Sequence, residues 1–236
     1  EDASHAIGAH YCENFNNLPQ ALNDEHPKKN QPIQPKVGSC KHSHITVFSF
    51  HPVKIITTAE GGMAMTNDAE LAHRMRRLRA HGIISDKQFM SPRPTNEIWN
   101  YQQTELGFNY RMSDVQAALG CSQLNRLDEF VEKRHAIARG YDDQLVPLGI
   151  ETPLRPPGVR SSYHLYPIRV SLEKNGVSQK DAMDTMKKYG VSPNLHYIPV
   201  HLQPYYRELG FGVGDFPAAE EYYERAITLP MFPALT

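Results

Sequence analysis

The feature that most restricts the fold is a short strand that ends in a proline-containing turn and presents a single lysine. Ile45 to Phe50 form a β-branched and aromatic run that predicts a strand. The next residues are His51-Pro52-Val53-Lys54, and the glycine pair Gly61-Gly62 follows shortly after them. A lysine that rigid backbone holds beside apolar surface loses its proton at modest cost and can attack a carbonyl carbon. A lysine after a strand is more often a solvated charge, so its neighbours must decide between these interpretations.

Composition excludes several classes of protein. The 236 residues are 40% hydrophobic and 22% charged, which is typical of a soluble globular protein with one large domain or two smaller ones. The formal net charge of -1 provides no basic field that would favour nucleic acid. No apolar run approaches the length of a membrane span, and no signal peptide is visible. The three cysteines are far apart, which argues against a disulfide framework and favours a cytoplasmic protein.

Strands alternate with helices along the first half of the chain, which predicts an α/β layer with a parallel sheet. In that half we expect a second strand near Met63–Thr66, a helix with Asn67 as its N-cap, and a long helix that a Ser113/Gln116 capping box opens. Between and before these elements, residues 12–36 and 84–105 are polar, contain prolines and predict loops.

The second half begins where Pro147, Pro153, Pro156 and Pro157 mark a change of composition. We therefore expect two domains, 1–145 and 146–236. The later domain is predicted to hold strands at 163–170 and 195–200, a helix at 178–189 that Gly190 stops, and a last helix from Pro217 to about Ala226. The chain opens on Glu1 rather than methionine and stops without a closing helix, so we expect a fragment cut at both ends.

Pyridoxal phosphate (PLP) makes three demands on a protein, and this chain offers candidates for each of them. The aldehyde needs a lysine, the ring nitrogen needs a carboxylate, and the phosphate needs hydrogen-bond donors. Asp2 lies at a predicted strand end, His5 could lie against a planar ring, and Ser49 precedes Lys54 by five residues. Asn109 stands just before a helix start, where an anion could be reached. Taken singly, each of these residues is more simply a turn, cap, strand or buried residue; their order and spacing together are specific.

At this point the chain resembles the sugar aminotransferases of the DegT/DnrJ/EryC1/StrS family. The matching segments cover most of the chain outside the two polar loops: Glu1–Gly8, Val47–Asn67, Leu106–Leu127, Ser161–Val170, Gly190–Tyr206 and Phe216–Pro230. The resemblance implies an α/β protein with the PLP-dependent transferase fold of aspartate aminotransferase (type I), truncated at both ends. The chain would hold the C-terminal part of the large domain and most of the small α+β domain.

The resemblance also implies a role for each candidate. Lys54 matches the Schiff-base lysine, Asp2 the carboxylate on the pyridine nitrogen, and His5 the residue stacked on the cofactor ring. Ser49 matches a phosphate ligand. Asn109 matches an asparagine that reaches the phosphate of the neighbouring subunit's cofactor, which implies a homodimer with shared active sites. The family's Gly/Ser/Thr-type phosphate loop is absent from this chain, which puts the activity of the chain alone in question.

Within the family, the chain is most similar to the enzymes that aminate a UDP-linked 4-keto-6-deoxy-N-acetylhexosamine in pseudaminic acid biosynthesis. The likeness is carried by Ser49–Lys54, Gln102–Met112 and His196–His201. It implies L-glutamate as the amino donor and PLP as the cofactor. His196 and Tyr197 fall in the family's substrate-side segment.

Four alternatives remain open. The chain could act on a different nucleotide-linked keto sugar, or it could be a catalytically incomplete remnant that still dimerises. A PLP-family sugar dehydratase is disfavoured because that branch replaces the Schiff-base lysine. A metal-binding module is a further alternative, through Cys40 with His42 and His44 or through Cys12 with His5 and His10, but these spacings match no common zinc pattern and we expect no metal.

Overall fold

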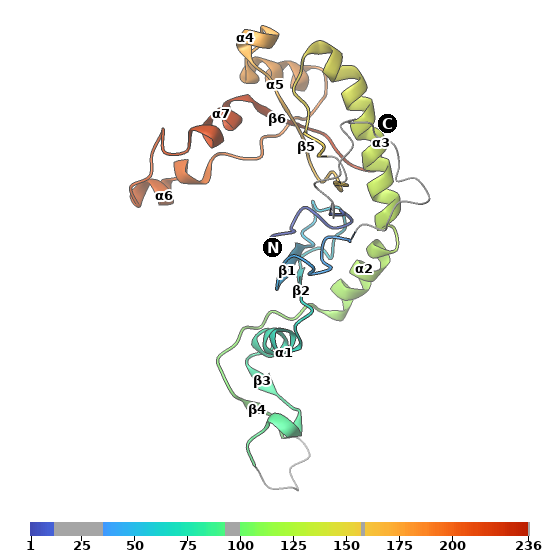
Figure 1. The fold of residues 1–236 in the computed structure, drawn as a ribbon, viewed down its shortest axis with the longest axis vertical. Helices are drawn as coiled ribbons and strands as arrows, with labels where there is room; N and C mark the ends of the chain where they lie inside the picture. The colour runs from blue at the N-terminus through green and yellow to red at the C-terminus, as the bar shows by residue number, and fades with distance from the viewer. Residues whose placement is uncertain (12–34, 93–99, 157–158, 236) are drawn as a thin grey trace. The chain divides into compact units, whose positions relative to one another are not determined.

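The computed structural model describes residues 1–11, 35–92, 100–156 and 159–235, which divide between two compact units (Figure 1). The first unit contains the described residues up to Arg126, and the second contains those from Leu127 onward. The predicted domain boundary at 145–146 lies at the C-terminal end of a helix, whereas the compact units divide at the N-terminal end of that same helix.

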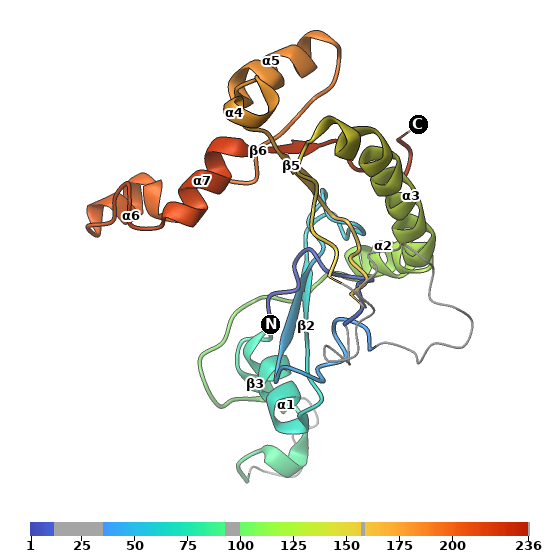
Figure 2. The same cartoon turned by 45° about the horizontal axis from the view of Figure 1, so that its top comes forward.

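The first unit is built from short strands and two helices. Its elements are β1 (Thr46–Ser49), β2 (Gly62–Met65), α1 (Ala69–Leu78), β3 (Ile83–Ile84), the 3₁₀ turn η2 (Lys87–Phe89), β4 (Gln102–Gln103) and α2 (Asp114–Leu124). β1 and β2 run side by side in Figures 1 and 2, and β3 pairs with β4.

The second unit is richer in helix. Its elements are α3 (Leu127–Leu145), η3 (Val146–Leu148), β5 (Tyr166–Arg169), α4 (Leu172–Asn175), α5 (Gln179–Lys188), η4 (Val200–Leu202), α6 (Pro204–Glu208), α7 (Pro217–Arg225) and β6 (Ala226–Leu229). As predicted, Ser178 caps α5, and Pro217 occupies the first turn of the last helix.

Strand pairing differs from the expected parallel sheet. Among the described residues, the three two-stranded sheets are all antiparallel, and the parallel pairing is the single bridge between Asp2 and Val47. The segment that joins β1 to β2 contains no helix, so the chain turns back and the strands pair antiparallel. Gly62 is required at the start of β2, because a Cβ there would lie 2.7 Å from the carbonyl oxygen of Phe48.

Two helix predictions are corrected by the structure. The N-cap of α1 is Asp68 rather than Asn67: its Oδ1 accepts from the backbone N–H groups of Glu70 and Leu71 at 2.8 and 3.0 Å. The Asn67 amide instead donates to the carbonyl of Ser39. The predicted long helix is two helices, α2 and α3, which separate at 125–126. The apolar spacing continues across this break, so periodicity alone did not reveal it.

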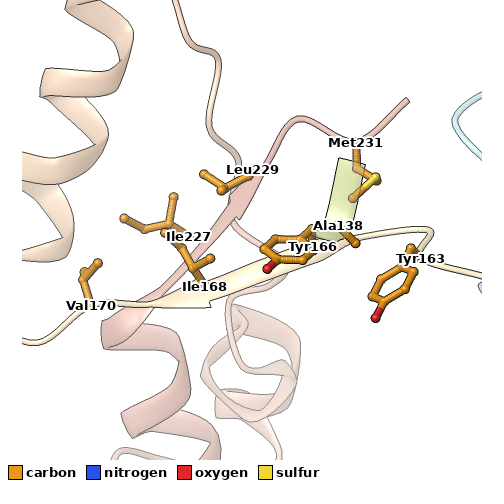
Figure 3. Packing of buried hydrophobic residues seen from close by; sticks show 8 residues of the cluster. All are labelled: Ala138, Tyr163, Tyr166, Ile168, Val170, Ile227, Leu229 and Met231. Atoms are coloured by element: carbon orange, nitrogen blue, oxygen red, sulfur yellow. The ribbon is translucent and has the colours of Figure 1, made fainter. Parts of the chain in front are cut away.

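The core of the second unit lies between the β5–β6 ribbon and α3. Alternate residues of β5 point into it, and all four residues of β6 are buried. Figure 3 shows the buried cluster, which consists of Ala138, Tyr163, Tyr166, Ile168, Val170, Ile227, Leu229 and Met231. Arg134 is buried beside it, and its Nη1 donates to the carbonyl groups of Tyr163, His164 and Met231.

The predicted strand at 195–200 is wrong. Asn194 alone pairs with β6, through a bridge to Thr228, and the chain then leaves the ribbon. Pro199 has no backbone N–H to donate to a ladder, and η4 begins at the next residue. In contrast, the strand predicted at 163–170 is present as β5.

Candidate active site

Lys54 lies on a loop that its own backbone holds closed. The loop leaves β1 at Phe50, whose N–H donates to the carbonyl of Gly61 at 2.9 Å. The carbonyl of Phe50 accepts from the Thr58 N–H and from the Thr57 hydroxyl, both at 3.0 Å. Within the loop, the Lys54 N–H donates to the His51 carbonyl. These bonds fix the backbone from which the lysine side chain extends.

The surroundings of Lys54 favour its neutral form. The side chain is partly buried, and the next two residues, Ile55 and Ile56, are 5% and 3% exposed. Burial lowers the pKa of Lys54, and this effect exceeds the opposing influence of the negative charge on Asp2. The sequence-based expectation of a lysine beside apolar surface is therefore consistent with the structure.

Asp2 reaches the same region through the parallel bridge to β1. The Ala3 N–H donates to the carbonyl of Val47, and the Val47 N–H donates to the carbonyl of Glu1. The pKa of the exposed Asp2 carboxyl is lowered, first by hydrogen bonds from Ser4 and further by the charges of His5 and Lys54. Asp2 and Lys54 thus lie close enough for each charge to change the pKa of the other.

His5 and Ser49 complete this group. His5 is exposed, three residues after Asp2 in the same N-terminal turn. Ser49 is the last residue of β1, opposite Gly62, and its hydroxyl oxygen accepts from the backbone N–H of His51 at 3.4 Å. The structure therefore places Asp2 within electrostatic reach of both His5 and Lys54, and Ser49 stands at the end of β1 from which the lysine loop leaves.

Asn109 occupies a different part of the first unit. It pairs with Ala80 after the end of α1, and its side chain is exposed. Phe108 and Tyr110 flank it with stacked rings whose centroids lie 4.7 Å apart. No hydrogen bond or ion pair among the described residues joins its side chain to Lys54. Within the described residues of this single chain, Asn109 and Lys54 are therefore not joined directly.

One hydrogen bond between the start of α2 and the lysine loop was not predicted from the sequence. The Gln116 side chain closes the predicted capping box with Ser113, and its Nε2 also donates to the Glu60 carbonyl at 2.9 Å. The Thr58 hydroxyl donates to the same carbonyl at 2.8 Å. Gln116 therefore ties the start of α2 to the lysine loop. The capping box was visible in the sequence, but the contact with a residue 56 positions away was not.

His196 and Tyr197 lie in the second unit. The Nδ1 of His196 shares a hydrogen bond of 2.9 Å with the Thr228 hydroxyl on β6, and the Tyr197 side chain is 62% exposed. Thr228 also pairs with Asn194 through two backbone hydrogen bonds. Strand β6 therefore contacts this segment twice, through the Asn194 backbone and through the His196 side chain.

Neither a metal site nor a membrane-spanning helix is found in the described part of the chain. Within it, no three His, Cys, Asp or Glu side chains are grouped so as to hold a metal ion; Cys12 lies outside the described residues. None of the described helices has the length and apolar character needed to cross a membrane.

Comparison with known proteins adds to this geometry. The sequence model of the DegT/DnrJ/EryC1/StrS aminotransferase family matches residues 1–236. The spore coat polysaccharide biosynthesis protein SpsC of Bacillus subtilis is 38% identical over 195 residues, which are 81% of this chain and 49% of SpsC. The chain spans about half the length of the curated relatives it matches.

Solved structures of sugar aminotransferases resemble the whole chain. Spr1654 of Streptococcus pneumoniae, which its name assigns to that class, matches with a TM-score of 0.79 and 29% identity over 100% of this chain and 52% of its own. That protein is also known in PLP and pyridoxamine phosphate (PMP) forms. PseC of Helicobacter pylori, an aminotransferase of pseudaminic acid biosynthesis, matches with a TM-score of 0.76 and 29% identity over 100% of this chain and 54% of its own. The fold of the type I PLP-dependent enzymes, expected from the sequence, is confirmed.

Proposed function

The chain belongs to the DegT/DnrJ/EryC1/StrS aminotransferase family, and from this premise we propose that it takes part in PLP-dependent transamination of a nucleotide-linked keto sugar. The observation that carries the proposal is the proximity of Lys54 and Asp2: the charge of each shifts the pKa of the other, and the bridge to Val47 holds Asp2 beside β1. The residues present suit the cofactor: Lys54 has a pKa lowered by burial, and Asp2 is a carboxylate whose pKa is lowered by hydrogen bonds.

In this proposal each residue at the end of β1 contacts one part of PLP. Lys54 would bond to the aldehyde carbon, Asp2 would face the ring nitrogen, and His5 would lie against the ring. Ser49 would donate its hydroxyl proton to the phosphate. When bound, the cofactor supplies an electron sink for the bond broken at the amino-bearing carbon.

The protein's own part in the reaction is to hold and move protons. Asp2 keeps a proton on the ring nitrogen, because an ionised carboxylate stabilises the cationic ring. Lys54 takes a proton from the Cα of the amino donor and later returns one to the sugar carbon that receives nitrogen. The lysine must be neutral to accept a proton, and burial favours that form.

For the substrates we propose a UDP-linked 4-keto-6-deoxy-N-acetylhexosamine and L-glutamate. The reaction would be that of the UDP-4-amino-4,6-dideoxy-N-acetyl-β-L-altrosamine transaminase of pseudaminic acid biosynthesis. The likeness to PseC supports this choice. In this assignment His196 and Tyr197 lie on the substrate side, and the hydrogen bond with Thr228 orients the His196 ring.

The proposal includes a homodimer in the cytoplasm. Asn109 would donate to the phosphate of the cofactor bound by the partner, so each site would need both chains. Its exposed amide and the exposed Phe108 and Tyr110 rings suit a surface that another chain covers. Residues 1–145 would belong to the large PLP-binding domain and residues 146–236 to the small domain. The widely spaced cysteines favour a reducing compartment.

A second candidate function has its own support. SpsC, at 38% identity, acts in spore coat polysaccharide biosynthesis, so a keto sugar from another polysaccharide pathway is the alternative substrate. A panel of UDP- and dTDP-linked 3-keto and 4-keto sugars, offered with PLP and L-glutamate, would separate the two. A mass increase on one sugar only would identify the substrate.

Borohydride trapping tests the central assignment directly. The chain is incubated with PLP, reduced with borohydride, and digested for mass spectrometry. We expect the reduced pyridoxyl phosphate group on Lys54 and none in Lys54→Ala. Lys36→Ala is the matched control, because Lys36 is an exposed lysine of the same unit, and it should label like the parent chain. Equal labelling of Lys54→Ala and the parent would refute the role of Lys54.

A further inference from the structure

Ser4 makes two hydrogen bonds to a single oxygen of Asp2. Its backbone N–H donates to Asp2 Oδ1 at 3.0 Å, and its hydroxyl donates to the same oxygen at 2.6 Å. The second distance is in the range of charge-assisted O–H···O⁻ bonds, which are stronger than bonds between neutral groups. Ala3, between the two residues, is 2% exposed and its N–H is bound to the carbonyl of Val47.

This arrangement makes the two oxygens of the carboxylate unequal. Oδ1 has two donors, whereas Oδ2 accepts no hydrogen bond from the described residues. An exposed aspartate would otherwise rotate about its side-chain torsions and exchange the two oxygens. Two donors from one residue, on a backbone that the bridge to β1 fixes, hold the carboxylate in one orientation.

We propose that Ser4 is a positioning residue for Asp2: by binding Oδ1 it leaves Oδ2 as the oxygen presented to a protonated ring nitrogen. This inference rests on the proposed function, in which Asp2 faces that nitrogen. Of the two donors, only the Ser4 hydroxyl can be removed by substitution with a residue other than proline, because all such residues keep the backbone N–H. The hydrogen bonds from Ser4 are also the largest cause of the lowered pKa of Asp2, so Ser4 helps to keep the carboxylate ionised.

The first test needs no cofactor. The pKa of Asp2 is measured in the apoprotein from the ¹³C shift of its carboxyl carbon, which Asp2→Asn assigns. Ser4→Ala removes the hydroxyl donor and should raise that pKa toward the ordinary value, whereas Ser4→Thr, which keeps a hydroxyl, should restore it. Ser178→Ala is the matched control: it removes an O–H···O bond of 2.7 Å to Asp181 in the other unit and should leave Asp2 unchanged.

The second test measures the binding of PLP by absorbance titration and the protonation of its ring by ¹⁵N shift. A lost hydrogen bond of this kind should weaken binding by about three- to tenfold in Ser4→Ala. Ser4→Thr should again restore the parent value. Circular dichroism checks that each variant folds, and Ser4→Cys, similar in shape but a weaker donor, replaces Ser4→Ala if the alanine variant unfolds.

The outcomes separate this inference from the proposed function. A pKa of Asp2 that does not move in Ser4→Ala overturns the inference, as does PLP binding within twofold of the parent when Asp2→Asn weakens it strongly. If Asp2→Asn itself changes neither PLP binding nor the ring ¹⁵N shift, the proposed role of Asp2 fails and the inference fails with it. Labelling of Lys54 by borohydride would still report on the function in that case.

Discussion

Replacing Gly107 with alanine should destabilise the segment that carries Asn109. An alanine Cβ at this position would lie 2.3 Å from the backbone nitrogen of Gly82 and 2.7 Å from the carbonyl oxygen of Leu78. Ordinary van der Waals contact begins at 3.4 Å, so the segment must move away by about 1 Å. The neighbouring atoms are backbone, and a side-chain rotation cannot relieve the overlap.

The magnitude follows from the bonds that such a movement breaks. The Phe108 N–H donates to the Leu78 carbonyl at 2.7 Å, and the His81 N–H donates to the Phe108 carbonyl at 2.9 Å. Each of these two backbone hydrogen bonds contributes about 1 kcal/mol, and overpacking costs about 1–3 kcal/mol, so Gly107→Ala should cost about 3–5 kcal/mol.

Two assays with a matched control test this figure. Urea unfolding gives the stability of the variant, and hydrogen exchange at the Phe108 and His81 amides locates the loss. Gly140→Ala is the control: it lies within α3 with nothing within 4 Å of the added Cβ, so it should stabilise the chain by up to about 1 kcal/mol. A Gly107→Ala protein within about 0.5 kcal/mol of the parent, with unchanged exchange, would refute the reasoning.

Two further predictions concern the second unit. Arg134→Met leaves three backbone carbonyls without their buried donor and should lower the free energy of unfolding by about 3–5 kcal/mol. Lys133→Met, at an exposed position of the same helix, should change that free energy by less than about 0.5 kcal/mol. Similar urea midpoints for the two variants would contradict this prediction. The pKa of Glu151 is lowered from 4.5 to about 2 by Lys174 and Arg225, so its stabilisation is present above pH 4.5 and is lost as the pH falls through about 2. Glu151→Gln should therefore cost about 1–2 kcal/mol at neutral pH and progressively less toward pH 2, and a pH-independent difference, or an equal effect of Glu173→Gln, would contradict the assignment.

Local patterns predicted most of the elements correctly. The strand at β1, the capping box at Ser113, the cap at Ser178 and the proline at the start of α7 depend on residues within a few positions of one another. The wrong predictions concern features that depend on a partner far away in the sequence, such as strand pairing, or on a small difference between neighbouring residues, such as the choice of N-cap. Residues 195–200 have the composition of a strand, but in this segment the backbone pairing with β6 stops at Asn194.

The candidate site residues follow from spacing and resemblance, but their geometry could not be predicted. Asp2 and Lys54 are brought together by the bridge to Val47, and no local signal in the sequence specifies that register. The hydrogen bond from Gln116 to the lysine loop and the two hydrogen bonds from Ser4 to Asp2 likewise involve side chains, and only the folded backbone brings these groups together. Sequence indicated which groups are present, and the fold indicates which of them act on one another.

The pKa shifts of Asp2 and Lys54 differ from those of an ordinary salt bridge. In a salt bridge each charge stabilises the other, so the pKa of the carboxyl falls and that of the lysine rises. Here the pKa of both groups is lowered, because burial outweighs the charge of Asp2 at Lys54, whereas Ser4 supplies the largest effect at Asp2. The carboxylate is thus kept ionised while the amine is brought closer to its neutral form. Acid–base sites typically hold two neighbouring groups whose environments favour different charge states, here a charged carboxylate and a neutral amine. A solvated surface lysine would instead keep its proton.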